Sequence, residues 1–131
     1  MIRGGGVPAG ASSELVQNID LLPSFLHFAG VELTQPIDGR LPVTFGGAEE
    51  RTAAMTEVFY PGATYHASIK SGEFDLHLDS VHPVGEDGRL DLSDYQAALY
   101  VGRKYDEDQS ARYPQEFDRL KRYALMQRAG Q

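Results

Sequence analysis

The chain has 131 residues, of which 41% are hydrophobic and 24% are charged, and it carries a formal net charge of −7. This acidic balance argues against DNA, RNA or an anionic membrane as a partner, because each of these requires a basic surface. The absence of cysteine excludes disulfides, zinc–thiolate sites and thiol nucleophiles, and it leaves the cellular compartment open. No apolar run approaches the roughly 20 residues that a membrane-spanning helix needs.

The first residues have the pattern of a strand that ends in a turn. Met1 and Ile2 precede the glycine- and proline-rich stretch RGGGVPAG. Two residues are too few to pair as a strand, so we expect its first half to lie upstream of residue 1. Residues 13–19 are predicted to form a short strand or an extended approach to the first helix.

A helix is predicted over residues 21–29. Asp20 is expected to cap it, because a carboxylate can accept a hydrogen bond from an unpaired N–H of the first turn. Pro23 falls in that turn, where a missing N–H costs little, and Gly30 stands where a left-handed residue ends a helix. The expected buried stripe has helical spacing and consists of Leu22, Phe25, Leu26 and Ala29.

Beyond a loop over residues 31–47, the pattern becomes that of strands. Residues 52–60, 65–72 and 73–80 are three strand-like runs, and residues 96–105 are predicted to form a fourth. The third run alternates apolar with polar side chains, as in a half-buried antiparallel strand. The apolar set is Phe74, Leu76 and Leu78, and the polar set is Asp75, His77 and Asp79.

The chain closes with a helix predicted over residues 114–128. Its expected apolar stripe consists of Phe117, Leu120, Tyr123 or Ala124, and Met126 or Gln127. The predicted fold class is therefore α+β: a small antiparallel sheet of three or four strands with the C-terminal helix packed on one face, preceded by a separate helix.

The polar face of the third predicted strand allows two interpretations. Asp75, His77 and Asp79 share that face, so a metal site is geometrically possible, but the solvated face of an amphipathic strand explains the pattern more simply. No recognisable catalytic motif accompanies it. The glycines at 4–6 lack the Lys-Ser/Thr of a phosphate loop, and no serine has the context of a nucleophile elbow.

Five segments follow one another along the chain in an order that resembles that of a known family. They are MIRGGGVPAG, ELVQNIDLLPSFLHFAGV, PIDGRLPVTFGG, RTAAMTEVFYPG and ASIKSGEFDLHL. This order resembles the C-terminal portion of the sulfatases, arylsulfatase-like enzymes of the alkaline phosphatase superfamily. The family's Asp-Leu-x-Pro-Thr-Leu-Leu-x-x-Ala-Gly helix is matched by Asp20, Leu21, Pro23, Ser24, Phe25, Leu26, Ala29 and Gly30.

A second match and two departures define how far the resemblance extends. Asp38-Gly39-Arg40 falls where the family has an Asp-Gly sequence. Gly4–Gly6 replace the family's Pro-Gly turn, and Asp75 stands where the family has a lysine. The resemblance is close over residues 1–80 and weakens over residues 81–131.

The resemblance implies two parts. Residues 1–50 would be the end of a catalytic-domain-like region, with a strand stub from a larger α/β catalytic domain, a helix and a loop. Residues 51–131 would be a C-terminal antiparallel-sheet subdomain with a terminal helix. Sulfatases use a formylglycine made from a Cys/Ser-x-Pro-x-Arg motif and a calcium-type divalent metal, and no residue here matches those groups. We therefore expect no catalytic residue, metal ligand or cofactor in this chain, and both groups only in the parent enzyme.

The leading functional hypothesis is a C-terminal sulfatase fragment, inactive alone, whose parent hydrolyses sulfate esters. The alternatives are the C-terminal part of a related phosphonate or phosphate monoester hydrolase, and a stand-alone non-enzymatic interaction module. The expected partners are the missing N-terminal catalytic region and, through an exposed helix 21–29, a second copy of the chain. Neither a nucleic acid nor a membrane is expected as a partner.

In the family, the segment that resembles TEVFYPGATYH lies near the mouth of the active site, where it helps to shape the substrate entrance. Its polar and aromatic members, Glu57, Tyr60, Tyr65 and His66, are our candidate substrate-binding residues. A carboxylate and an imidazole can hydrogen-bond the hydroxyls of a sugar or phenol, and tyrosines can stack on its ring. Alternatively, Glu57 and His66 are surface residues at strand ends and the tyrosines belong to the core.

Overall fold

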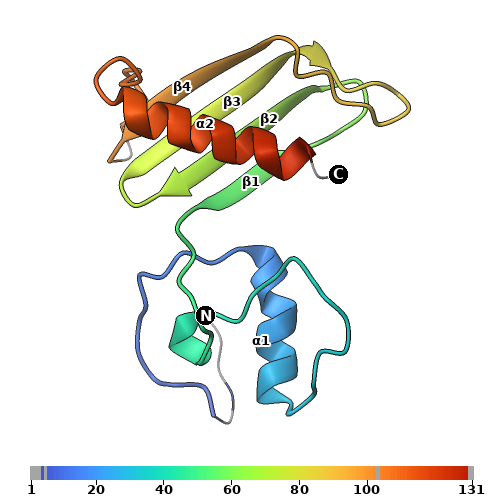
Figure 1. Cartoon of the computed structure of the whole chain (residues 1–131), viewed down its shortest axis with the longest axis vertical. Helices are drawn as coiled ribbons and strands as arrows, with labels where there is room; N and C mark the ends of the chain where they lie inside the picture. Colours follow the sequence, from blue (N-terminus) through green and yellow to red (C-terminus); the bar gives the residue numbers. More distant parts are fainter. Residues whose placement is uncertain (1–3, 5, 103, 130–131) are drawn as a thin grey trace. The chain divides into compact units, whose positions relative to one another are not determined.

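The computed structural model describes residues 4, 6–102 and 104–129, and the chain divides into two compact units, residues 1–54 and 55–131 (Figure 1). The strand expected at residues 1–2 lies outside the described residues. None of the helices in the described part of the chain is both long enough and apolar enough to cross a membrane.

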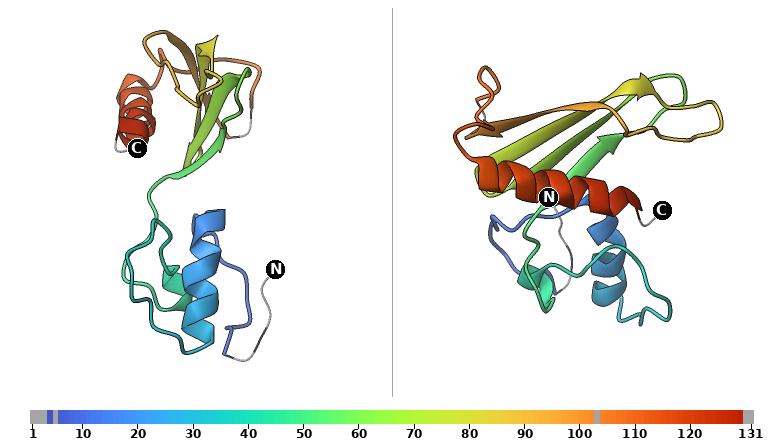
Figure 2. Two further views of the ribbon diagram at one scale, coloured as in Figure 1. Left: turned by 90° about the vertical axis from the view of Figure 1, so that its right-hand side faces the viewer. Right: turned by 45° about the horizontal axis from the view of Figure 1, so that its top comes forward.

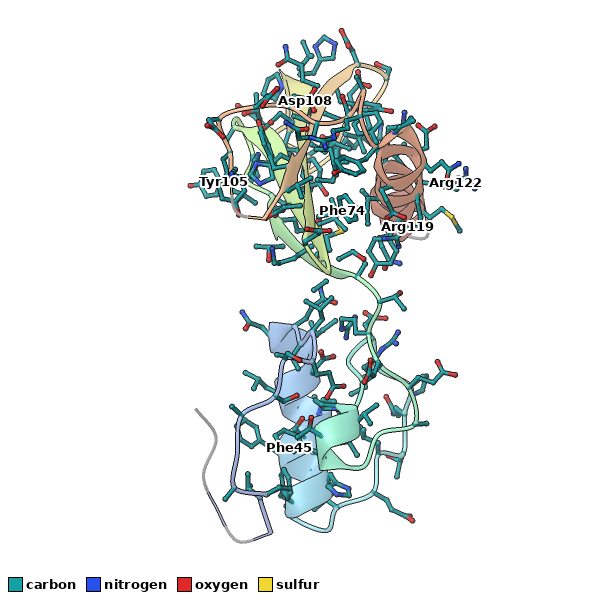
Figure 3. All side chains as sticks on the ribbon, turned by 90° about the vertical axis from the view of Figure 1, so that its left-hand side faces the viewer. Phe45, Phe74, Tyr105, Asp108, Arg119 and Arg122 are labelled. Atoms are coloured by element: carbon teal, nitrogen blue, oxygen red, sulfur yellow. The ribbon has the colours of Figure 1, made fainter. Side chains whose placement is uncertain are left out.

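The described residues of the first unit form one α-helix and two short 3-10 helices. These are η1 (Asn18–Asp20), α1 (Leu21–Phe28) and η2 (Val43–Phe45). Residues 11–17 carry no regular secondary structure, so the chain approaches the helix without forming a strand. Phe28 near the end of α1 packs edge-to-face on Phe45, with ring centroids 5.1 Å apart (Figure 3).

Helix α1 forms where it was predicted, but it buries a different face. Pro23 and Ser24 are buried, whereas Leu22 and Phe25 are 53% and 57% exposed. The Ser24 hydroxyl donates a 2.6 Å hydrogen bond to the Asp20 carbonyl oxygen, which accounts for a polar residue on the inner face. The burial expected from the spacing of the stripe therefore does not occur within the described chain. Leu22 and Phe25 are exposed instead, as the expectation of an exposed helix 21–29 requires.

The second unit is built on a four-stranded antiparallel sheet. Its strands are β1 (Ala54–Val58), β2 (Thr64–Ser71), β3 (Phe74–Pro83) and β4 (Tyr95–Val101), and they lie side by side in sequence order (Figure 1). The β2–β3 hairpin closes through Gly72 and Glu73, and Ser71 pairs with Phe74. Gly72 has φ 59°, a conformation that glycine adopts without steric cost in such a tight turn.

Helix α2 (Pro114–Ala129) covers one face of this sheet (Figure 2, left). The side chains between the two layers form the core of the unit. They are Tyr65, Ala67 and Ile69 from β2, Leu76 and Leu78 from β3, Leu99 from β4, and Leu120 and Ala124 from α2. The predicted α+β fold, with a small sheet and a packed C-terminal helix, is therefore confirmed.

The apolar stripe of α2 is shorter than predicted. Leu120 and Ala124 are buried, and Phe117 and Tyr123 are half-buried, but Met126 is 65% exposed. At the start of the helix, Tyr113 packs against Phe74 of β3 with ring centroids 5.3 Å apart, on the α2 side of the sheet (Figure 3). The sheet is thus covered on one face, and its other face is left for polar and aromatic side chains.

Candidate functional site

Two of the four predicted substrate-binding residues meet. The Tyr65 hydroxyl on β2 donates a 2.9 Å hydrogen bond to Oε2 of Glu57 on β1. Tyr65 is only 1% exposed, so its ring belongs to the core and its hydroxyl orients an exposed carboxylate. Tyr60 lies in the β1–β2 connection and is 68% exposed. Of the two tyrosines, Tyr60 is therefore the one whose ring is free to stack on a ligand.

His66 lies on the opposite side of the sheet from Tyr65. Successive residues of a strand point to opposite faces, and β2 alternates buried odd-numbered positions with half-buried even-numbered ones. The His66 imidazole Nδ1 is 2.5 Å from Oδ1 of Asp79, its partner on β3. The predicted residues thus form a Glu57–Tyr65 pair and a His66–Asp79 pair on different faces.

The face of the sheet away from α2, here called the open face, holds a buried carboxylate. Asp75 of β3 is only 6% exposed. Its Oδ1 accepts a 2.7 Å hydrogen bond from the Ser68 hydroxyl, and its Oδ2 accepts a 3.0 Å bond from the Tyr105 hydroxyl. Tyr105 lies on that side of the sheet (Figure 3). The alternation of β3 predicted a solvated Asp75, and the cover by Tyr105 makes that prediction wrong.

An aromatic cluster surrounds His77 beside this carboxylate. The His77 ring lies 5.0 Å from the ring of Tyr100, 5.4 Å from that of Tyr105 and 5.6 Å from that of His66, centroid to centroid. Its Nε2 is 3.5 Å from Oδ1 of Asp75. The open face therefore presents ordered imidazole and phenol rings with hydrogen-bonding edges, a surface suited to polar ring-shaped ligands.

The same contacts bear on the metal interpretation of β3. Asp75, His77 and Asp79 share the open face, as the sequence predicted, but each aspartate contacts a different histidine. Within residues 4, 6–102 and 104–129, no group of three or more histidine, aspartate or glutamate side chains has the geometry to hold a metal ion. The arrangement is two imidazole–carboxylate pairs.

In the first unit, a buried carboxylate joins three separate parts of the chain. Oδ1 of Asp20 accepts a 2.9 Å hydrogen bond from the backbone N–H of Arg40 and pairs with the guanidinium of Arg51, and its Oδ2 accepts a 2.8 Å bond from the N–H of Gln17. Asp20 is 3% exposed and Arg51 is 8% exposed. Asp20 is the N-cap residue of α1, as predicted, but its carboxylate makes no hydrogen bond to that helix, so the predicted capping bond is wrong.

The loop that carries Arg40 to Asp20 requires glycine at position 39. A Cβ on Gly39 would lie 2.0 Å from the carbonyl oxygen of Ile19, a distance that no side chain can occupy. The missing Cβ lets the 38–40 loop approach the helix entrance closely enough for Arg40 to reach Asp20. We call the set Gln17, Asp20, Gly39, Arg40 and Arg51 the Asp20 joint.

Hydrogen bonds lower the pKa values of two carboxylates in this unit, Asp20 and Glu14. Burial opposes ionisation of Asp20, but bonds from the N–H groups of Arg40 and Gln17 and from Arg51 outweigh it and hold the pKa below its ordinary value. Glu14 behaves in the same way. Burial opposes its ionisation, but bonds from the N–H groups of Thr44 and Val43 lower its pKa and tie residue 14 to η2.

Sequence reasoning missed the Asp20 joint and the cover over Asp75. Arg51 is 31 residues from Asp20, and Tyr105 is 30 residues from Asp75, so no local pattern connects either pair. The available signal for the joint was the Asp38-Gly39 sequence, which the resemblance singled out without a physical reason. Comparison of the chain with protein-family models, with curated proteins and with solved structures found no match in any of the three.

Proposed function

We propose that this chain is the C-terminal portion of a sulfatase-like hydrolase, inactive alone, whose parent hydrolyses sulfate esters. In this proposal the nucleophile, the formylglycine and the divalent metal belong to the parent's catalytic region. The part described here then supports that region and lines its substrate entrance. The proposal rests on the sequence resemblance, and the structure adds a physical reason for the residues that carry it.

The observation that carries the proposal is the Asp20 joint. Gln17 and Asp20 belong to the second of the five resembling segments, Arg40 to the third and Arg51 to the fourth. Three segments that resemble one family in their order therefore converge on one carboxylate. Glu14 adds a further link between the second and third segments, through Val43 and Thr44.

The second unit supports the same proposal through its architecture. The resemblance implied paired strands over residues 67–78 and a terminal helix, and β2, β3 and α2 have these positions. Fold alone does not define an activity, because one architecture carries many chemistries. The role in substrate binding therefore depends on Glu57 and Tyr60, which are exposed and adjacent to the turn between β1 and β2.

In the proposed entrance, Tyr65 positions Glu57 and does not touch substrate. Its hydroxyl donates to the Glu57 carboxylate while its ring is packed in the core. Glu57 then accepts a hydrogen bond from a hydroxyl of the sulfated sugar or phenol, and Tyr60 stacks on the ring. His66 pairs with Asp79 on the open face, which is the opposite face of the sheet from Tyr65.

The coding sequence upstream of Met1 tests the parent assignment directly. The proposal expects an in-frame Cys/Ser-x-Pro-x-Arg motif with aspartate and asparagine metal ligands. A threonine or serine nucleophile without that motif would instead support a phosphate or phosphonate monoester hydrolase. An open reading frame that begins at Met1 would support a stand-alone interaction module. Purified 131-residue chain should not hydrolyse aryl sulfates, and metal-dependent turnover that survives repurification would contradict the proposal.

The entrance role is tested in the full-length enzyme with Glu57→Ala. Loss of one hydrogen bond to a neutral hydroxyl should lower kcat/KM by the equivalent of about 0.5–1.5 kcal/mol, mainly through KM. Tyr65→Phe should give a smaller change in the same direction, because it frees the Glu57 carboxylate without removing it. Glu73→Ala, an exposed glutamate in the β2–β3 turn, is the matched control. Wild-type kcat/KM in both Glu57→Ala and His66→Ala would make this segment structural.

A further inference from the structure

The outer edge of β4 is closed by a loop at two residues, Val101 and Leu99. The Val101 carbonyl oxygen accepts a 3.3 Å hydrogen bond from the N–H of Lys104. Leu99 lies in β4 and is fully buried. Its N–H donates a 3.0 Å hydrogen bond to Oδ1 of Asp108, and its carbonyl oxygen accepts a 2.7 Å bond from the N–H of Gln109. Because β4 is the last strand of the sheet, these two groups point away from β3.

The two bonds at Leu99 are the ones that a fifth strand would make. In an antiparallel ladder, the two residues of a hydrogen-bonded pair exchange both N–H···O bonds. At Leu99, the Asp108 side chain takes the place of the neighbouring carbonyl, and the Gln109 backbone supplies the neighbouring N–H. The loop therefore imitates one residue of a missing strand.

The loop is anchored on both faces of the sheet. We call residues 104–113 the edge strap. On the open face, the Tyr105 hydroxyl bonds to Asp75, and on the α2 side Tyr113 packs against Phe74. The Asp108 carboxylate also accepts two bonds from Ser110, which fix its orientation. The edge strap thus passes around β4 from one face to the other, with Asp108 on it (Figure 3).

The edge strap buries little apolar surface, because none of residues 104–113 is fully buried. A partly open pocket of about 460 Å³ lies between the edge strap and the end of β4 at Val101 and Gly102. The pocket is lined mainly by charged or polar side chains of the strap, among them Lys104, Asp106, Glu107 and Arg112. Residues 104–108 are all exposed. A segment with little buried apolar surface opens at a lower free energy than the core does.

The sequence of the strand beneath the edge strap does not itself block pairing. The sequence of β4 is YQAALYV, without a charged residue or a proline. Natural edge strands avoid pairing through charges, prolines, bulges or a covering segment. Here the covering segment is the device that the described residues provide.

We propose that β4 is a latent pairing edge held closed by the edge strap, and that the partner it takes when the strap is displaced is β4 of a second copy of this chain. Antiparallel pairing of identical strands obeys a two-fold axis, so one edge satisfies both copies. The uncharged sequence of β4 places no like charges opposite each other in that arrangement. This inference is independent of the proposed function and of any association through α1.

The test uses the full chain with Asp108→Ala, which removes the acceptor for Leu99. The Leu99 amide should exchange with solvent about tenfold faster, the loss expected for one hydrogen bond to a charged group. Sedimentation should show a dimer whose population rises with protein concentration. The matched control is Asp106→Ala, the same charge change on the same strap without a bond to β4. Asp108→Asn keeps an acceptor oxygen and should behave as the control does.

The location of the contact is read with cysteine cross-linking, because the chain has no cysteine of its own. Ala98→Cys, at the centre of β4 and therefore next to its own copy across the two-fold axis, should form a disulfide-linked dimer readily in the Asp108→Ala background and poorly in the wild type. Adding Gln96→Lys to Asp108→Ala should restore the monomer by placing a charge on the edge, whereas Phe25→Glu should not.

Three results would overturn the proposal. One is a monomeric Asp108→Ala variant whose Leu99 amide exchanges as in Asp106→Ala. Another is a dimer that survives Gln96→Lys but disappears with Phe25→Glu. Should Asp108→Ala fail to fold, Tyr105→Phe loosens a second side-chain anchor of the strap without changing β4. Faster exchange at Leu99 with unchanged amides in β2 would then support the proposal, and no change at Leu99 would refute it.

Discussion

The two units of the chain are stabilised in different ways. In the described part of the first unit, the buried residues are Asp20, Pro23, Ser24, Pro42, Arg51 and Ala53. In the second unit, buried apolar side chains from β2, β3, β4 and α2 fill the space between a sheet and a helix. The first unit is therefore held mainly by specific polar contacts, and the second by removal of apolar surface from water.

The two units also differ in how much apolar side-chain surface they expose. Large apolar side chains that should be buried are exposed in the first unit, where Val16, Ile19, Leu21, Leu22, Phe25, Val31 and Leu33 are all more than 40% exposed. Apolar side chains gathered on the surface of one unit have the chemistry of an interaction surface. The described residues of the first unit leave this surface uncovered, whereas in the second unit α2 and the sheet cover each other's apolar faces.

The largest expected effect is that of Asp20→Ala. This change leaves the Arg51 guanidinium buried without its carboxylate, which should destabilise the first unit by about 3–5 kcal/mol. Residues 1–54 should lose their amide protection while residues 55–131 keep theirs, as measured by hydrogen exchange. Asp38→Asn, in an exposed position of the same unit, is the control. Protection that falls equally in both units would show that they are one cooperative structure.

A core truncation in the second unit should give the converse pattern. Leu76 is fully buried between the sheet and α2, so Leu76→Ala should cost about 2–5 kcal/mol through lost burial and the cavity it leaves. Met126→Ala removes an exposed side chain of α2 and should change stability by less than about 0.5 kcal/mol. Chemical denaturation monitored by the signals of α2 provides the measurement. Equal effects of the two substitutions would contradict the described core.

As the pH is lowered, the first unit should lose its structure before the second unit does. The pKa values of Glu14 and Asp20 are lowered in the folded state, because hydrogen bonds to their carboxylates outweigh the cost of burial. Their contribution is therefore complete above the unfolded pKa of about 4 and is lost as pH falls through the lower folded values. In a titration from pH 6 to pH 2, NMR signals of residues 11–50 should change before those of β2 and β3. The reverse order would contradict the polar account of the first unit.

The smallest expected effect is on self-association through α1. Phe25→Glu places a charge in the exposed apolar patch and should weaken any association of the chain by about tenfold, or 1.4 kcal/mol. Stability of the monomer should hardly change, because the side chain is 57% exposed. Tyr60→Glu alters a similarly exposed ring in the second unit and serves as control. Sedimentation at several concentrations decides whether the apolar surface of the first unit is an interface.

The sequence predicted the second unit well because its signals are local. The alternation of β3, the glycine in the β2–β3 turn and the proline at the start of α2 each act within a few residues. It predicted the interior of the first unit poorly, because helical periodicity identifies an apolar face but not whether the fold covers it. The candidate site shows the same limit, since the positions of Glu57 and Tyr65 depend on a contact between two strands.

The close approach at Gly39 has a consequence for tracing relatives of this chain. Because a Cβ there would overlap the Ile19 carbonyl oxygen, a lineage that keeps the Asp20 joint must keep glycine at this position, however far the surrounding loop diverges. The apolar stripe of α1 is free to drift among hydrophobic types. A sequence pattern weighted on Asp20, Gly39 and Arg51 should therefore detect distant relatives that overall sequence identity would miss. A saturation library at position 39, selected for folded protein, should return glycine alone.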